Sequence, residues 1–262
     1  MADKSKFDTE TTARHYAAAR PTYPSELFDT LDDLLGHRLA GASVVDVAAG
    51  TGISSRQLAE RGAHVTAVEL SGAMIAQLAG SSPGVRAVQG SGHALPLADG
   101  SADLITYAQA WHWMDPERAL PEIRRVLRPG GVFALWWNQT DRTSGWAKEQ
   151  AERITAVVPG WGQEDGTDSA RAAELDHVLP RKHSFRFASQ RTVPIETHLS
   201  NLASKSYIAA LGEGLEPLLD SERRILTELF PEGEVTEHFS TLLVASLPNG
   251  GDLSIAQKSQ AV

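Results

Sequence analysis

The sequence predicts an α/β fold in which a mostly parallel sheet of seven strands is covered by helices on both faces. Three observations lead to this prediction: short β-branched segments alternate with helical ones, a small-residue turn follows the first strand, and the connections have helix length. Such a connection returns the chain to the same strand direction, so the strands that it joins are parallel. The site of such a sheet lies at the C-terminal ends of its strands.

The first half of the chain contains five segments with the β-branched and apolar composition of buried strands. They lie at 43–47, 64–69, 85–88, 103–108 and 132–137. The ends of the helices between them are marked by Ser71 and Asp115 as N-caps, Pro116 as a first helical residue and Gly62 as a C-terminal residue. These helices are expected at 53–61, 71–80 and 115–127.

The second half begins with a stretch, 138–180, in which glycines, tryptophans and charged residues follow no period, which predicts a lid or an irregular connection. Periodicity then predicts strands that add antiparallel pairs to the sheet edge, and further helices. The strands are expected at 183–193 and 235–247, and the helices at 195–211 and 221–230. The chain therefore divides into four parts. N-terminal helices that cover the ligand are expected at 1–40 and a ligand-binding core at 41–140. A lid with cap helices and the final strands is expected at 141–248, and a disordered tail at 249–262.

Composition limits the classes of function. Of 262 residues, 42% are hydrophobic, which is enough for a sizeable core. Acidic residues outnumber basic ones, 33 to 24, and the net charge of −9 argues against a nucleic-acid-binding surface. The absence of cysteine excludes disulfides and thiol nucleophiles, and no histidine spacing indicates a metal site. Without an 18-residue apolar run or an apolar N-terminal signal segment, we expect a soluble, cytoplasmic protein with no membrane partner.

The turn after the first strand carries the first functional signal. Gly50 and Gly52 allow a ligand close to the backbone at a helix N-terminus, although a tight turn without a ligand would use them too. Glu69 ends the second strand, where a carboxylate can accept both hydroxyls of an adenosine ribose. Asp46 would repel the pyrophosphate of a dinucleotide but attract the ammonium and sulfonium of S-adenosylmethionine, unless it only caps the turn. Ser55 replaces the third glycine of the dinucleotide fingerprint.

Five motifs follow in order: D-V-A-A-G-T-G, E-L-S-G-A-M, G-S-G-H-A-L-P-L, A-Q-A-W-H-W-M-D and L-R-P-G-G, at 46–52, 69–74, 90–97, 108–115 and 127–131. The segment Y-A-A-A-R-P-T-Y-P precedes them at 16–24. Together they resemble the class I S-adenosylmethionine-dependent methyltransferases, in the small-molecule branch with the trans-aconitate methyltransferase-like proteins and the methyltransferase type 11 domain. The resemblance runs to about residue 247 and implies a Rossmann-like fold.

The resemblance implies S-adenosylmethionine as the cofactor and S-adenosylhomocysteine as its product. Arg20 would pair with the cofactor carboxylate, Leu70 would line the adenine, and Ser91 stands where the family often has an acid. Ala48 replaces a customary glycine, and its methyl group is tolerated there if φ is negative. The full implied cofactor set is Tyr16, Arg20, Asp46, Ala48, Gly50, Gly52, Glu69, Leu70, Met74, Ser91, Gly92, His93 and Gln109.

The expected chemistry is in-line displacement from a sulfonium whose leaving group departs neutral, so positioning is the main demand. Positioning contributes up to about 7 to 11 kcal/mol, whereas a general base adds about 10²- to 10⁴-fold. His112 is the candidate base, or else a hydrogen-bonded wall of the pocket. Aromatic residues are expected to line the acceptor pocket, namely Tyr23, Trp111, Trp113, Trp137 and Tyr207. Since side chains alternate along a strand, only some of the tryptophans can face the pocket while the others pack in the core, and a core position is the alternative for Tyr207. Trp146 and Trp161 are expected in the lid.

The sequence therefore predicts a cytoplasmic enzyme that methylates a small molecule, most simply at oxygen, and acts as a monomer or homodimer. One alternative is a protein of the same fold that binds the cofactor without methyl transfer or performs another reaction. A second is an NAD-dependent reductase. A tRNA or protein methyltransferase is disfavoured by the net acidity.

Overall fold

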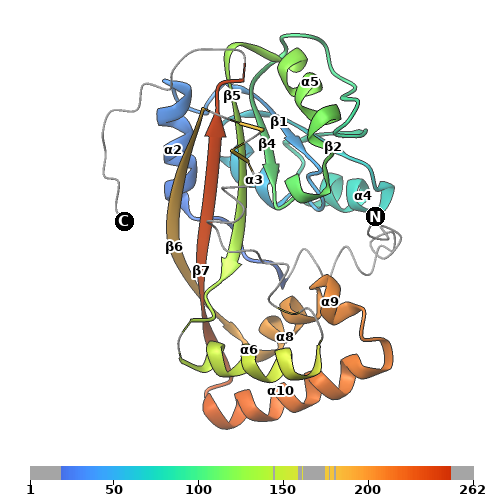
Figure 1. Cartoon of the computed structure of the whole chain (residues 1–262), viewed down its shortest axis with the longest axis vertical. Helices are drawn as coiled ribbons and strands as arrows, with labels where there is room; N and C mark the ends of the chain where they lie inside the picture. The colour runs from blue at the N-terminus through green and yellow to red at the C-terminus, as the bar shows by residue number, and fades with distance from the viewer. Residues whose placement is uncertain are drawn as a thin grey trace.

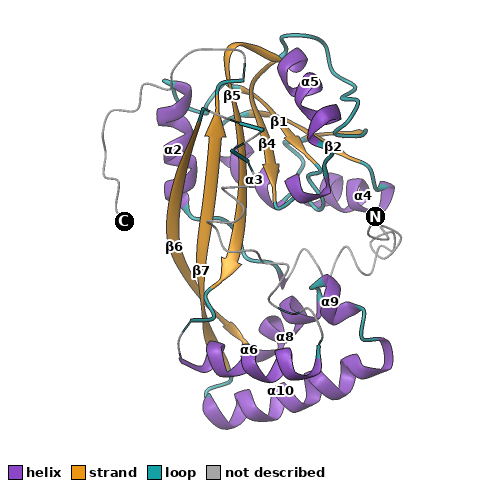
Figure 2. Ribbon diagram, in the orientation of Figure 1, coloured by secondary structure: helices purple, strands orange, loops and turns teal. Residues whose placement is uncertain are grey.

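The computed structural model describes residues 19–143, 145–158, 161, 175–176, 178–179 and 181–248. Its sheet has seven strands in the order β3-β2-β1-β4-β5-β7-β6 (Figures 1 and 2). Strands β3, β2, β1, β4 and β5 are parallel, and β7 runs antiparallel between β5 and β6. The predicted fold class is confirmed. The strands are β1 (Ser43–Val47), β2 (His64–Glu69), β3 (Arg86–Gln89), β4 (Ala102–Ala108), β5 (Leu127–Thr140), β6 (Lys182–Pro194) and β7 (Glu234–Ser246).

The chain order of the strands reverses between β1 and β4. From β1 the chain continues outward through β2 to β3, and then returns to place β4 on the other side of β1. The crevice at the C-terminal ends of two such strands is where ligands bind in open α/β sheets. The segments that follow Val47 and Ala108 therefore border the expected site.

Helices cover both faces of the sheet because successive side chains of each strand point to opposite faces. Trp136 packs on one face with α2 (Ser25–Leu35) and α3 (Ile53–Glu60), and Trp137 on the other with α5 (Pro116–Val126). A further helix, α4 (Gly72–Ser81), packs beside β2 and β3. Within the N-terminal part expected at 1–40, α2 has its apolar side buried against the sheet.

A cap of helices gathers at the far end of the long strands, at the bottom of Figure 1. It has its own apolar cluster, which includes Ile154, Leu199, Leu226 and Val235. Among the described residues, its helices are α6 (Gly145–Val157), α8 (Ile195–Ala203), α9 (Ser206–Ala209) and α10 (Leu215–Leu229). The described residues also form the 3-10 turns η2 (Trp111–Trp113) and η3 (Gly212–Gly214).

The cap differs from the prediction in three places. Helix α6 lies in the stretch expected to be irregular; of its residues only Gln150 and Ile154 are buried, so its apolar stripe is too short to give a helical period. The helix expected at 195–211 is divided into α8 and α9 by a turn at 204–205, and α10 begins at Leu215 rather than at residue 221. The tail at 249–262 lies outside the described residues.

Buried polar groups hold the cap to the last strand of the sheet. The carboxylate of Glu237 on β7 accepts hydrogen bonds from Arg191 Nε at 2.5 Å and Asn201 Nδ2 at 3.3 Å, and lies 2.8 Å from His198 Nδ1. Burial alone would raise the pKa of Glu237, but His198 and Arg191 outweigh burial and hold that pKa below its usual value.

Among the helices that the structure describes, none has the length and hydropathy needed to cross a membrane.

Candidate functional site

Two residues with strained backbone border the crevice between β1 and β4. Ala48 follows β1 with φ +54°, and Gln109 follows β4 with φ +58°; in the described chain, no other non-glycine residue has a positive φ. The condition for an unstrained alanine at this position, a negative φ, is therefore not met at Ala48. A left-handed conformation costs an L-residue about 1 to 2 kcal/mol, and such strain is concentrated at functional sites. The crevice is thus formed from backbone that the fold holds in an unfavourable conformation.

The two glycines of the turn have different roles. Gly50 has φ +58°, and a Cβ atom there would meet nothing within 4 Å, so this position is open to a ligand. Gly52 has φ +80°, and a Cβ atom there would lie 2.8 Å from Leu78 Cγ on α4. Gly52 is thus required for the turn and for the close packing of α4, whereas Gly50 leaves the backbone accessible.

Glu69 fixes the turn from the end of β2. Its Oε2 accepts a hydrogen bond from Gly50 N at 2.9 Å, and its Oε1 accepts from Leu70 N at 2.7 Å and from Ser71 N at 2.9 Å. A carboxylate offers about four acceptor sites, so this arrangement leaves room for about one more donor. We therefore correct the expectation of two ribose hydroxyls on Glu69 to one.

Asp46 lies beneath the turn and does not face the crevice. It is fully buried, and its carboxylate accepts from Ser55 Oγ at 2.6 Å and Thr106 Oγ1 at 2.8 Å. The pKa of Asp46 is raised to about 6, chiefly by burial and to a smaller extent by the charge of Glu69, although the hydroxyls that donate to it lower the pKa. Asp46 thus joins β1, β4 and α3, and the expected direct contact with a cationic ligand has no support in its position.

The residues expected around the adenine divide into exposed and structural ones. Leu70 is 51% exposed and presents an apolar surface beside Glu69 that fits the face of a base. Met74 is buried in α4, where its backbone N–H donates to the N-cap Ser71. Of the expected cofactor residues, Tyr16 lies outside the described part of the chain.

The residues of the segment after β3 make hydrogen bonds and packing contacts within the protein. The hydroxyl oxygen of Ser91 accepts from His93 N at 3.2 Å, and His93 Nε2 accepts from Asp115 N at 2.9 Å, at the N-terminus of α5. Gly92 is buried, and a Cβ atom there would lie 2.8 Å from Met114 Sδ. His93 and Gly92 thus serve the packing of α5 and η2, and the Ser91 hydroxyl retains its hydrogen for donation.

A pocket with a cavity volume of about 30 Å³, open to solvent, lies at the ends of β4 and β5, and we call it the strand-end cleft. It brings together the segment before α2, the two strand ends and the turn after α8, and its lining includes Arg20, Tyr23, Gln109, Asn138, Thr140 and Lys205. Three of these, Arg20, Tyr23 and Gln109, were predicted from the sequence. No acidic residue is among the described residues that line it.

Hydrogen bonds hold the walls of the strand-end cleft in place. Gln109 Nε2 donates to the carbonyl of Asn138 at 3.0 Å, and Arg20 Nη2 donates to the carbonyl of Ser204 at 3.2 Å. Gln57 on α3 brackets the backbone of Tyr23, accepting from its N–H at 2.9 Å and donating to its carbonyl at 2.8 Å. The segment before α2 is thereby fixed to both the core and the cap.

Most of the aromatic residues predicted for the acceptor pocket lie elsewhere. Trp111 and Trp137 are buried in the apolar cluster under α5, with the Trp111 ring 5.3 Å from that of Tyr107. Trp113 is 37% exposed beside His112, which is also on the surface. Burial of Trp111 and Trp137 under the helices of the sheet gives their predicted role no support, whereas the role of the exposed Trp113 stays a prediction.

Neither Tyr207 nor His112 lines the strand-end cleft. Tyr207 packs against the apolar cluster of the cap, while Lys205, two residues earlier, reaches the cleft. His112 lies in η2 with its ring 4.9 Å from that of Trp113, so its position gives the role of a general base no support.

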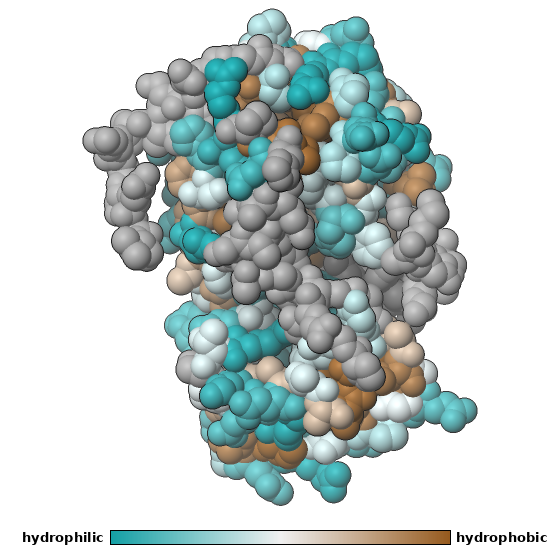
Figure 3. All heavy atoms as spheres, in the orientation of Figure 1, coloured by the Kyte–Doolittle hydropathy of each residue, from teal (hydrophilic) through white to brown (hydrophobic). Residues whose placement is uncertain are grey.

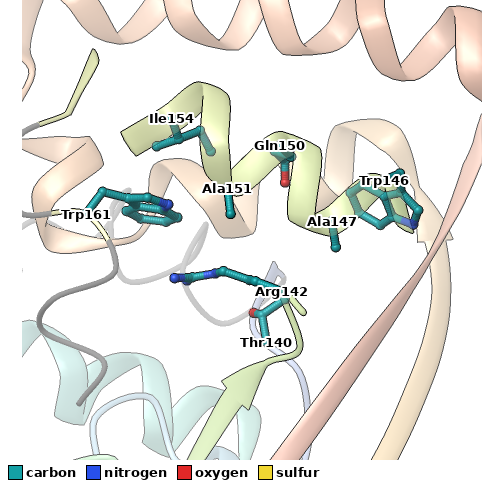
Figure 4. Close-up of a pocket in the computed structure, with 8 residues that line it drawn as sticks. All are labelled: Thr140, Arg142, Trp146, Ala147, Gln150, Ala151, Ile154 and Trp161. Atoms are coloured by element: carbon teal, nitrogen blue, oxygen red, sulfur yellow. The ribbon is translucent and has the colours of Figure 1, made fainter. Parts of the chain in front are cut away.

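A second pocket, with a cavity volume of about 20 Å³, lies between the end of β5 and α6, and we call it the tail pocket (Figure 4). Its lining includes Thr140, Arg142, Trp146, Gln150, Ile154 and Trp161. Sequence reasoning missed Asn138, Thr140 and Arg142. The only signal in the sequence is that every residue from 138 to 143 is polar directly after the apolar part of β5, and this does not distinguish these three from their neighbours.

The comparisons with known proteins agree with this geometry. A family described as a methyltransferase domain matches residues 45–135. An uncharacterized methyltransferase of Mycobacterium tuberculosis is 43% identical over 139 residues, which are 53% of this chain and 55% of that protein. The match thus spans about half the length of that relative. An uncharacterized methyltransferase-like protein of Schizosaccharomyces pombe is 30% identical over 245 residues, which are 90% of this chain and 93% of that protein.

Solved structures show the same fold. A proposed type II methyltransferase from Anaeromyxobacter dehalogenans matches with a TM-score of 0.68 at 23% identity, over 88% of this chain and 99% of that one. An S-adenosylmethionine-dependent methyltransferase from Geobacter sulfurreducens, solved in complex with S-adenosylhomocysteine, matches with a TM-score of 0.54 at 17% identity, over 94% of this chain and 100% of that one.

Proposed function

The chain belongs to the class I S-adenosylmethionine-dependent methyltransferases, and we propose that it transfers a methyl group from this cofactor to an oxygen atom of a small molecule in the strand-end cleft. The observation that carries this proposal is the lining of the cleft. Arg20 and Lys205 border it at the ends of β4 and β5, beside the crevice where the cofactor would bind, and none of its described lining residues is acidic.

The residues at the crevice fit the proposed cofactor. Gly50 leaves its backbone accessible, Glu69 keeps an acceptor site for a ribose hydroxyl, and Leu70 offers an exposed apolar surface for the base. Arg20 lies at the other end of the site, where a guanidinium suits the carboxylate of the methionine part. The donor set thus matches a nucleoside with a charged amino-acid tail.

When bound, S-adenosylmethionine supplies an electrophilic methyl group on a sulfonium. The protein has no leaving group to protonate, so the residues of the cleft have only to orient the acceptor oxygen and exclude water. Gln109 and Asn138 stand at the two strand ends and are tied to each other, which makes them rigid supports for the acceptor. Rigid positioning of this kind contributes up to about 7 to 11 kcal/mol in favourable reactions.

The charge of the strand-end cleft favours an oxygen acceptor over an amine. With Arg20 paired to the cofactor carboxylate, Lys205 remains to stabilise an ionised carboxylate or hydroxyl of the acceptor, which keeps its lone pair available for attack. Lys205 also repels an ammonium group, which finds no carboxylate partner among the described lining residues. An ionised acceptor also needs no general base, in agreement with the surface position of His112.

Methyl-labelled S-adenosylmethionine with a library of small carboxylic and hydroxylic metabolites tests the proposal. We expect label on an oxygen atom of one acceptor, with equal release of S-adenosylhomocysteine. Lys205→Gln is expected to raise the KM of that acceptor about tenfold, because it removes a charged hydrogen-bond donor from the cleft, whereas Lys148→Gln on α6 changes nothing. Cofactor binding without labelled product, or label on nitrogen or carbon, contradicts the proposal.

A further inference from the structure

Arg191 on β6 and Glu237 on β7 form a buried ion pair between the last two strands of the sheet. The two residues stand opposite each other in the strand register, and opposite residues of antiparallel strands have Cβ atoms about 4.5 to 5.5 Å apart. Arg191 Nε donates to Glu237 Oε2 at 2.5 Å, and the Glu237 side chain is 1% exposed. The Arg191 guanidinium also lies over the ring of Phe239, 5.7 Å from its centroid. Contacts on its edge and on its face thus fix this guanidinium.

Arg191 also holds the segment before α2. Its Nη2 donates to the carbonyl oxygen of the buried Ala19 at 2.8 Å. A guanidinium can bridge two acceptors in this way because its N–H donors form a rigid fork. The next residue is Arg20, which lines the strand-end cleft. The backbone that carries Arg20 is therefore held by Glu237 through Arg191.

The same carboxylate is connected to the side chain of Arg20 through the end of α8. Glu237 Oε1 lies 2.8 Å from His198 Nδ1 and accepts from Asn201 Nδ2 at 3.3 Å. Ser204 follows α8, and its hydroxyl donates to the carbonyl of Asn201 at 2.7 Å. The carbonyl of Ser204 in turn accepts from Arg20 Nη2 at 3.2 Å. A closed ring of hydrogen bonds thus starts at Glu237, and both of its branches end at Arg20.

We propose that Glu237 is a positioning residue for the cofactor site, which holds Arg20 through Arg191 on one side and through α8 on the other. Its two oxygens then fix the backbone and the guanidinium of Arg20 where this group pairs with the carboxylate of the methionine part. A guanidinium has five N–H donors, so the contact with Ser204 is compatible with such a pair. Glu237 itself is not among the described residues that line the strand-end cleft. This inference rests on the proposed function, because that function assigns Arg20 to the cofactor carboxylate.

Two ligands that differ in the amino-acid part test the inference without turnover. S-adenosylhomocysteine carries the carboxylate, whereas 5′-methylthioadenosine keeps the nucleoside and the thioether but lacks the amino-acid part. Calorimetry on the full chain gives both dissociation constants. Glu237→Gln is expected to weaken S-adenosylhomocysteine about fivefold to tenfold and 5′-methylthioadenosine less than twofold, because an amide turns an NH₂ group toward donors that the carboxylate accepts. Equal weakening of both ligands, or of neither, overturns the inference.

Two further variants separate positioning from a general loss of stability. Arg191→Gln, at a side chain that is 22% exposed, leaves Glu237 in place and is expected to have the same ligand-selective effect. Glu222→Gln is the matched control, because Glu222 is also 1% exposed but accepts from Arg153 and Gln150 instead. It is expected to leave the ratio of the two dissociation constants unchanged. A change in this ratio as large as that of Glu237→Gln would overturn the inference.

Arg20→Gln provides the reference for the selective effect. It is expected to weaken S-adenosylhomocysteine at least as much as Glu237→Gln does, and the double variant to bind no more weakly than Arg20→Gln, since both changes act through one contact. Additive effects would overturn the inference and leave the role of Arg20 intact. Equal weakening of both ligands by Arg20→Gln would contradict that role and the inference with it. The expected binding results in a protein that yields no labelled product would contradict only the proposed methyl transfer.

Discussion

The carboxylate of Glu69, at the end of β2, accepts a hydrogen bond of 2.9 Å from the backbone N–H of Gly50 in the turn after β1. Its other oxygen accepts from Leu70 N and Ser71 N, so a single side chain fixes two neighbouring turns. The same carboxylate is the expected partner of a ribose hydroxyl. The shape of the crevice therefore depends on one carboxylate group, and we expect its affinity for the cofactor to depend on the same group.

Glu69→Gln tests this dual role. We expect the affinity for S-adenosylhomocysteine to fall about tenfold to a hundredfold, because an amide has one acceptor oxygen and its NH₂ group would face a backbone N–H. Isothermal titration calorimetry gives the dissociation constant, and Glu60→Gln at the exposed end of α3 is the control. An unchanged dissociation constant in a folded variant would contradict the role in ribose binding.

The strained turn at Ala48 predicts a stabilising substitution. Because φ is +54° there, Ala48→Gly removes a backbone strain of about 1 to 2 kcal/mol. Glycine also loses more chain entropy on folding, which costs up to about 1 kcal/mol, so we expect the free energy of unfolding to rise by about 0.5 to 1 kcal/mol. Ala49→Gly, at the next residue without a positive φ, is expected to destabilise the protein instead. Urea denaturation of both variants measures the difference, and equal effects would exclude strain as the cause.

Burial of Asp46 predicts a pH-dependent stability. Because its pKa is about 6 in the folded chain against 3.8 for the free group, the folded state holds the proton more tightly. The stability contributed by the protonated carboxyl group of Asp46 is fully present below about pH 4 and is lost as the pH rises through 6. At about 1.4 kcal/mol per pKa unit, the wild type should lose about 2 kcal/mol relative to Asp46→Asn between pH 4 and pH 7. Parallel unfolding free energies of the two proteins over this range would contradict it.

The surface position of His112 predicts a modest effect of its removal. We expect His112→Ala to lower kcat less than tenfold, because the ring lies outside both pockets and the proposed acceptor is already ionised. Loss of a general base would cost about 10²- to 10⁴-fold and would change the pH profile of kcat. Steady-state kinetics from pH 5 to pH 9 distinguish these two outcomes. A fall in kcat of about 10²- to 10⁴-fold would support the role of His112 as a general base.

The sequence predicted the sheet well because its signals are local. Short β-branched runs, the caps at Ser71 and Asp115 and the glycines of the first turn each act within a few residues. The cap was harder, since α6 buries only Gln150 and Ile154 and gives no helical period. Membership of the methyltransferase family also removes the alternative of an NAD-dependent reductase.

The positions of site residues were predicted best where a sequence motif contains them. They were predicted worst where burial of the side chain determines whether it reaches the site. Gly50, Glu69 and Arg20 lie at the crevice or the strand-end cleft as expected. Burial of Asp46 and of Trp137 depends on which helices cover each face of the sheet, and no local pattern contains that information. The same is true of Lys205, which reaches the cleft from the cap.

Strands β6 and β7 pair without interruption from Lys182 with Ser246 to Pro194 with Glu234. One end of this ribbon lies beside β5 in the sheet, and at the other end Val235 belongs to the apolar cluster of the cap. Sheet and cap are consequently not separable bodies joined by a linker. Gradual heating should melt them in one cooperative transition, with a single heat-absorption peak in calorimetry.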